Sequence, residues 1–264
     1  MSPGHTIMHS IPSLTLVHLR LIARQSGLGA AVLAAAALLI PLWLLVADLR
    51  AVPAGNELSG LPGDWWPALL LTGGFVWLSY LLAFLWPETV WRNLGPGERS
   101  ELDSLPVTRT RNRCARLLAG SSLPALLGLS VSLSAIVLLS RGAGEILEVL
   151  GAPDAGVDVG PNHTVISGPL AMLVAYSFSS ILALRLGRVL LPLIVIALAV
   201  LALPALLVWG GAEWLRGFTE AVAFHPYSPI PALMYGGESV VPRLLWLVTF
   251  GAVAVHLAGK HDHQ

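Results

Sequence analysis

Six long runs of apolar residues divide the chain, and shorter polar stretches separate them. Each run is about as long as the roughly 20 helical residues that cross a bilayer core of about 30 Å. The pattern therefore predicts an all-α membrane protein with six transmembrane helices. The six runs are residues 27–47, 65–86, 117–139, 165–184, 189–209 and 241–258.

Prolines, serines and tryptophans predict how these helices pack. Pro41, Pro124, Pro192 and Pro204 each remove a backbone donor, so we expect kinks there and neighbouring groups that bond the freed carbonyls. Indoles at the ends of the runs are expected at the headgroup level; they belong to Trp65, Trp66, Trp86, Trp91, Trp209 and Trp214. Serines within the runs are interpreted as small packing residues whose hydroxyls bond their own or a neighbouring helix; they are Ser121, Ser122, Ser130, Ser132, Ser134, Ser177, Ser179 and Ser180.

Basic residues in the connections predict the orientation, because arginine and lysine resist translocation. One side has eleven: Arg20, Arg24, Arg92, Arg99, Arg109, Arg111, Arg113, Arg116, Arg185, Arg188 and Lys260. The other side has four, which are Arg50, Arg141, Arg216 and Arg243. Both termini are therefore expected in the cytoplasm, and the chain in the inner membrane of the cell.

The segment before the first run is expected to form an amphipathic helix. From Pro12 onward, one helical face carries Ile11, Leu14, Val17, Leu21 and Ile22, and Arg20 and Arg24 flank that face. Such a helix would lie in the cytoplasmic interface with its arginines near anionic headgroups. The alternative is a plain extension of the first transmembrane helix.

The connection of residues 87–116 is the longest on the cytoplasmic side. Gly95, Pro96 and Gly97 break the chain, and residues 98–105 can then form two helical turns that end at Pro106. Leu102 and Leu105 would share one face of this short helix, where they could enter a groove on a cytoplasmic partner. The alternative is a solvated loop with ordinary positive-inside charge.

Residues that follow this short helix are expected to start the third transmembrane helix. Thr108 can cap it. Four arginines would anchor it at the anionic leaflet; they are Arg109, Arg111, Arg113 and Arg116.

The outer connections differ in character. Residues 140–164 are acidic and rich in turn formers, and Asn162-His163-Thr164 is interpreted as a turn. Residues 210–240 combine helical spacing of apolar residues with three prolines, which predicts a bent, re-entrant segment that could cover an exit path; the alternative is a purely structural cap. Its candidate gate residues are Trp214, Phe218, His225, Pro226, Tyr227, Pro229, Pro231 and Tyr235.

Composition and charge exclude several other classes of protein. Hydrophobic residues make up 55% of the 264 residues, charged residues make up 11%, and the net charge is zero, which does not fit a nucleic-acid-binding protein. Cys114 has no partner for a disulfide or a cysteine metal site, and no metal or cofactor is expected in this chain. The only lysine, Lys260, precedes a histidine, so a Walker-type ATP site is absent.

Two classes of membrane protein are disfavoured because the sequence lacks the side chains that their mechanisms need. Ion-coupled carriers use ionisable groups near the bilayer midplane, and none is expected there. The sequence His256-Leu-Ala-Gly259, near the end of the last of six runs, superficially resembles the last helix of the rhomboid proteases. Their Gly-x-Ser-Gly motif is not matched, because Val165 and Glu57 stand where Ser167-Gly168 and Ser59-Gly60 would need glycine.

The inner connection carries the most specific resemblance. Glu98-Arg-Ser-Glu-Leu-Asp-Ser-Leu-Pro-Val-Thr-Arg-Thr-Arg111 resembles the inner loop of the permease subunits of ABC-2 type transporters, with its Leu-Pro-Val-Ser/Thr-Arg core. The whole layout is also similar, although Arg113 or Arg116 stands where many members have lysine. The resemblance implies a single permease domain over residues 1–264, divided into a cytoplasmic segment 1–26, a six-span bundle 27–258 and a cytoplasmic tail 259–264.

The resemblance also implies partners and roles. Two permease copies, identical or homologous, would each bind a separate ATP-binding subunit that holds ATP and Mg²⁺, so this chain is not an enzyme by itself. The first and fifth runs would line the dimer interface and the path, and residues 98–105 would be the coupling helix. Its partner-docking residues would be Glu98, Arg99, Glu101, Leu102, Asp103, Leu105 and Arg109. An apolar lining without charges suggests export of an amphiphilic or lipid-like substrate, although the family also includes polysaccharide exporters. The alternative function is a membrane scaffold for a cytoplasmic complex.

Overall fold

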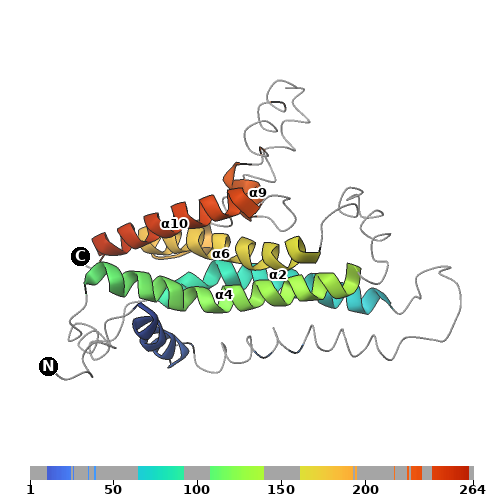
Figure 1. Cartoon of the computed structure of the whole chain (residues 1–264), viewed down its shortest axis with the longest axis horizontal. Helices are drawn as coiled ribbons and strands as arrows, with labels where there is room; N and C mark the ends of the chain where they lie inside the picture. The colour runs from blue at the N-terminus through green and yellow to red at the C-terminus, as the bar shows by residue number, and fades with distance from the viewer. Residues whose placement is uncertain are drawn as a thin grey trace, which may run out of the picture.

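Helices make up nearly all of the part of the chain that the computed structural model describes, and this part contains no strand. The described residues are 11–24, 26, 35, 39, 65–91, 108–139, 161–192, 194, 217, 225, 227–233 and 240–261. Their main helices are residues 11–24, α2 (Trp65–Trp91), α4 (Arg109–Leu139), α6 (Pro161–Leu186), α9 (Pro229–Leu233) and α10 (Val240–His261) (Figure 1).

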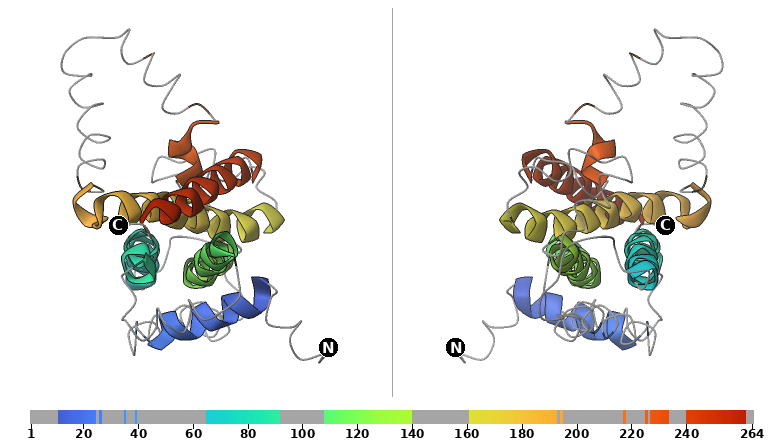
Figure 2. Two further views of the ribbon diagram at one scale, coloured as in Figure 1. Left: turned by 90° about the vertical axis from the view of Figure 1, so that its left-hand side faces the viewer. Right: turned by 90° about the vertical axis from the view of Figure 1, so that its right-hand side faces the viewer.

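The long helices form an elongated bundle around α6, which contacts α2, α4, α9 and α10 (Figure 1). The helix of residues 11–24 lies on the side of α2 and α4 that faces away from α10 (Figure 2). At one end of the bundle α2, α6 and α10 finish and α4 begins. We call this the basic end, because the described arginines gather there, apart from Arg243. They are Arg20, Arg24, Arg109, Arg111, Arg113, Arg116, Arg185 and Arg188.

Three described helices are long and apolar enough to cross a membrane: Arg109–Ser134, Val165–Leu186 and Val240–Ala258. They coincide with the third, fourth and sixth predicted runs, and the second run falls within α2. Most of the first run and most of the fifth lie outside the described residues. The described residues thus confirm an all-helical protein with helices suited to a membrane. The structure supports three of the six proposed spans.

The boundaries of the helices follow from local signals in the sequence. α4 starts immediately after Thr108, whose carbonyl accepts the N–H of Asn112 at 3.1 Å, as expected for a residue that caps a helix. α6 ends at Leu186, and the next residue, Gly187, has φ 68° and donates its N–H to Ala183 O at 3.0 Å. Pro161 is the first residue of α6, so Asn162-His163-Thr164 forms the first turn of a helix and the predicted turn is wrong.

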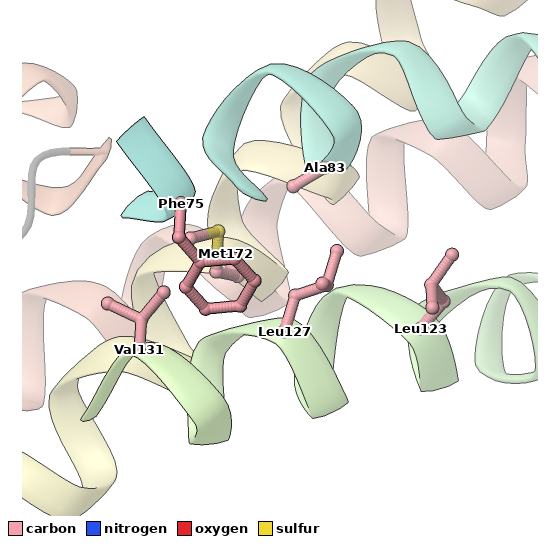
Figure 3. Packing of buried hydrophobic residues seen from close by; sticks show 6 residues of the cluster. All are labelled: Phe75, Ala83, Leu123, Leu127, Val131 and Met172. Carbon is pink, nitrogen blue, oxygen red and sulfur yellow. The ribbon is translucent and has the colours of Figure 1, made fainter. Parts of the chain in front are cut away.

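A buried apolar cluster joins α2, α4 and α6. Figure 3 shows its members, which are Phe75 and Ala83 from α2, Leu123, Leu127 and Val131 from α4, and Met172 from α6. α4 and α6 approach so closely that a Cβ on Gly128 would lie 2.6 Å from Gly168 O. The N–H of Gly168 also donates to Ser132 Oγ at 3.2 Å, so a small residue and a hydroxyl fix this crossing.

The predicted bonding of a freed carbonyl is confirmed at Pro124, and the predicted bonding of serine hydroxyls is confirmed for five serines, whereas Ser130 Oγ is buried without a hydrogen-bond partner among the described residues. Pro124 cannot donate an N–H to Gly120 O, and the indole N–H of Trp86 donates to that oxygen instead, at 2.9 Å. Trp86 therefore takes part in the contact between α2 and α4. Serine hydroxyls bond carbonyls of their own helix at 2.7–2.8 Å in Ser121, Ser122, Ser134, Ser179 and Ser180.

The amphipathic face predicted for residues 11–24 is only partly correct. Leu14, Leu21 and Ile22 are buried as expected, but Ile11 and Val17 are 40% and 39% exposed. His18 completes the buried face, which packs against the bundle: Ile22 joins a second apolar cluster with Val90, Ala119 and Tyr176. The face toward the bundle is therefore distinct from the exposed side that bears Leu16, Leu19, Arg20 and Arg24.

Candidate functional site

The most connected polar site in the described chain lies at the basic end, where residues 92–107 leave α2 and enter α4. It comprises His18, Glu88, Val90, Trp91, Asn112 and Arg116, which we call the loop-base cluster. These residues come from the N-terminal helix, the last turns of α2 and the first turns of α4. The cluster therefore holds the two ends of the inner connection.

Arg116 joins the start of α4 to the end of α2. Its Nε donates to Val90 O at 2.8 Å, and its guanidinium carbon lies 5.4 Å from the centre of the Trp91 ring. The last carbonyls of a helix have no partner within it, so a cation at this position both bonds a free acceptor and complements the helix dipole. The stacking adds a cation–π attraction. Arg116 thus joins α4 to the end of α2.

His18 joins the N-terminal helix to the same turn of α4. Its Nε2 lies 2.6 Å from Asn112 Oδ1, and the side chain is only 2% exposed. Burial lowers the pKa of His18 below its usual value of 6.5, the hydrogen bond with Asn112 opposes that change, and the positive charge of Arg116 lowers the pKa further. The packed helix therefore favours neutral His18.

Glu88 joins α2 to the chain that follows α6. Its carboxylate accepts a short hydrogen bond from the backbone N–H of Val189, which is fully buried. Residues 190–192 directly after Val189 are helical, so the carboxylate stands at the start of a helix, where backbone N–H groups need acceptors.

The loop-base cluster is built to hold chain segments together. Its hydrogen bonds connect side chains with backbone groups or with each other, and no three His, Cys, Asp or Glu side chains lie together as metal ligands in the described residues. A force applied to residues 92–107 would reach α2 through Val90 and Trp91, and α4 through Asn112 and Arg116.

Most of the predicted partner-docking residues lie outside the described residues. This applies to Glu98, Arg99, Glu101, Leu102, Asp103 and Leu105. Arg109 is the first residue of α4 and is exposed at the basic end.

The described part of the predicted outer segment includes α9, which contacts α10 and lies beside its start, away from the basic end (Figure 1). The N–H of Tyr227 donates to His225 Nδ1 at 3.2 Å, and Trp246 Nε1 donates to Tyr227 O at 2.9 Å. Pro229 starts α9, which also contains Pro231. Trp214, Phe218, Pro226 and Tyr235 lie outside the described residues.

Arg243 was counted in an outer connection although it falls within the sixth run, 241–258, and the structure places it in α10. Arg243 belongs to α10, is 1% exposed, and places Nη1 3.4 Å from Ser167 O in α6. The sixth run therefore contains a buried cation near its start, which contributes to the contact between α6 and α10.

Ser167 and His256 lie too far apart to form a protease pair. Ser167 O is beside Arg243, and His256 follows Arg243 by 13 residues in the same helix. That separation is about 20 Å along the axis.

Sequence reasoning did not identify His18, Glu88, Asn112 or Trp246 as connecting residues. His18 had a usable signal, because it lies four residues after Leu14 and four before Ile22 and so falls on their helical face. Glu88 is the acidic residue nearest to the end of the second run. Nothing in the sequence indicates that its partner is a backbone group 101 residues away.

Comparison of this chain with protein-family models, curated proteins and solved structures finds no match.

Proposed function

We propose that this chain is the transmembrane permease subunit of an ATP-driven transporter of the ABC-2 type. In this proposal six helices span the inner membrane, with both termini in the cytoplasm, and a separate ATP-binding subunit docks on residues 98–105. A second permease copy or a homologue completes the transporter. The loop-base cluster is the main support, because a connection that receives force from a partner needs firmly joined ends, and here Arg116 and Val90 join them.

The proposed mechanism is alternating access. Closure of the ATP-binding partners would push residues 98–105, and α2 and α4 would move as a unit because Arg116 connects them. Segment 214–235 would form the outer gate, with its hinge near the contact between Tyr227 and Trp246. The apolar helices favour an amphiphilic or lipid-like exported substrate.

The direct test is co-purification of the full chain from its native host in mild detergent, with mass spectrometry of the bound proteins and an ATPase assay. We expect an ATP-binding protein that is lost when Leu102 and Leu105 are both replaced by Asp. The matched control is Ser100→Asp with Ser104→Asp, which adds the same charge to the opposite face of residues 98–105. A chain that purifies alone, with no ATPase activity dependent on Leu102 and Leu105, would contradict the proposal.

A substitution in the predicted outer segment distinguishes a permease from a scaffold. Tyr235→Arg should abolish transport and leave partner binding intact if the chain is a permease. A scaffold would tolerate this change in every assay of the cytoplasmic complex.

A further inference from the structure

The chain makes a tight turn between α6 and the run of residues 189–209. Gly187 adopts φ 68°, a conformation that glycine reaches without a steric penalty, and its N–H closes α6 on Ala183 O. Arg188 is exposed, and Val189 is completely buried. The fifth run therefore begins inside the bundle, at the basic end.

The first bond of this run is made to another helix. The N–H of Val189 donates to Glu88 Oε1 of α2. A carboxylate at the start of a helix accepts a backbone N–H that has no acceptor in its own helix, and its negative charge complements the helix dipole. Most helices take this acceptor from a neighbouring residue in the sequence, whereas here it comes from 101 residues away.

The same turn of α2 also bonds to α4. Glu88 lies two residues before Val90, whose carbonyl accepts Arg116 Nε. Residues 92–107 begin directly after this turn. One helical turn thus has three attachments, to α4, to the inner connection and to the fifth run.

We infer that Glu88 is a positioning residue that makes the start of run 189–209 follow the end of α2 when the inner connection is displaced. This inference rests on the proposed function only for the source of the displacement. The attachment itself is a property of the isolated chain, and it can be tested there.

The first experiment measures distances between spin labels in the full chain in detergent. Cysteines replace Leu81 and Leu191, which are 47% and 68% exposed, in a Cys114→Ser background. We expect one narrow distance distribution with Glu88 and with Glu88→Gln, since the amide oxygen still accepts the N–H of Val189. Glu88→Ala should broaden the distribution, and the neighbouring Thr89→Ala should not.

A second label pair separates positioning from general loss of structure. Labels at Leu81 and Leu118, both exposed, report the distance between α2 and α4. Glu88→Ala should leave this distance unchanged. The inference is overturned if Glu88→Ala does not alter the Leu81–Leu191 distribution, or if it broadens both pairs equally.

The second experiment uses the complex with the co-purified ATP-binding protein. A non-hydrolysable ATP analogue should change the Leu118–Leu191 distance in the wild-type complex. Glu88→Ala should keep the partner bound and lose this change; an undiminished change would overturn the coupling role. Failure of the wild-type chain to bind any ATP-binding protein would contradict the proposed function, whereas the measurements on the isolated chain would still decide the role of Glu88.

Discussion

At the scale of single residues, His18 makes the attachment of the N-terminal helix sensitive to pH. The packed helix lowers the pKa of His18, whereas the detached helix would restore its usual value of 6.5. Below pH 6.5 the detached state binds more protons, so packing weakens as the pH falls from 6.5 toward the lowered pKa and then levels off. The change cannot exceed about 1.4 kcal/mol per pH unit.

Hydrogen exchange checks this prediction in the full chain. Amide protection of residues 11–24, corrected for the intrinsic rate, should fall between pH 7.5 and pH 5.5. His18→Gln, which can still bond Asn112 and carries no charge, should remove the pH dependence. Equal pH dependence in both proteins would mean that another group is responsible.

The contribution of Trp86 to stability depends on Pro124, a proline in another helix. Its indole bonds the carbonyl of Gly120 that Pro124 leaves without a donor. Trp86→Phe should therefore cost about 1 kcal/mol of stability. In a Pro124→Ala background the restored N–H can bond Gly120 O, and the same change should cost less.

A double-mutant cycle in detergent, followed by SDS-induced unfolding, measures this difference. We expect a coupling energy of about 0.5 kcal/mol or more between Trp86 and Pro124. Strict additivity of the two changes would show that the bond to Gly120 contributes nothing to stability.

At the scale of helices, the crossing of α4 and α6 depends on two glycines. A Cβ on Gly128 would meet backbone atoms of Gly168 and Pro169 at 2.6 Å, and backbone cannot move aside as a side chain can. Gly128→Ala should therefore destabilise the chain by about 1–3 kcal/mol. Gly74→Ala is the matched control, because no atom lies within 4 Å of its added Cβ. Thermal unfolding in detergent should separate the two variants, and equal stability would refute the close crossing.

The sequence allowed the helices to be predicted well and their contacts poorly. Runs of apolar residues located four of the described helices, because the requirement for about 20 apolar residues is local. The second apolar run stops at Trp86, but the helix continues to Trp91, and Arg116 from α4 bonds the carbonyl of Val90 in its last turn. Such a bond depends on the fold and leaves no periodic pattern in the sequence.

In the candidate site, too, the sequence predicts what depends on local spacing and does not predict contacts between distant segments. His18 could have been placed on the buried face of residues 11–24 from spacing alone. Glu88 and Arg116 could not have been assigned, because each bonds a backbone group of a distant segment, and backbone acceptors and donors are identical at every position in the sequence. Counting charges between runs assigned the described arginines other than Arg243 to one side, and the structure places them at one end of the bundle. The count failed for Arg243 because it does not detect a cation that is buried near a helix end.

At the scale of the whole molecule, the two ends of the helices carry different segments. Residues 11–24 and the start of α4 lie at the basic end, whereas α9 lies beside the start of α10, away from that end (Figure 1). Tyr227 precedes α9 by two residues. α4 has 31 residues and is therefore about 46 Å long, which exceeds the bilayer core. If the bundle spans the membrane with the basic end inside, residues 23 and 227 must lie on opposite sides.

Cysteine labelling tests this arrangement. In a Cys114→Ser background, Ala23→Cys and Tyr227→Cys place single thiols at exposed positions of the two ends. A membrane-impermeant maleimide should label Tyr227→Cys in intact cells, and Ala23→Cys only after permeabilisation, with the Cys114→Ser parent as the unlabelled control. Labelling of both thiols from the same side would contradict a bundle that spans the membrane. The reverse pattern would place residues 98–105 outside, where no ATP-binding subunit could reach them, so this measurement tests the orientation on which the proposed coupling depends.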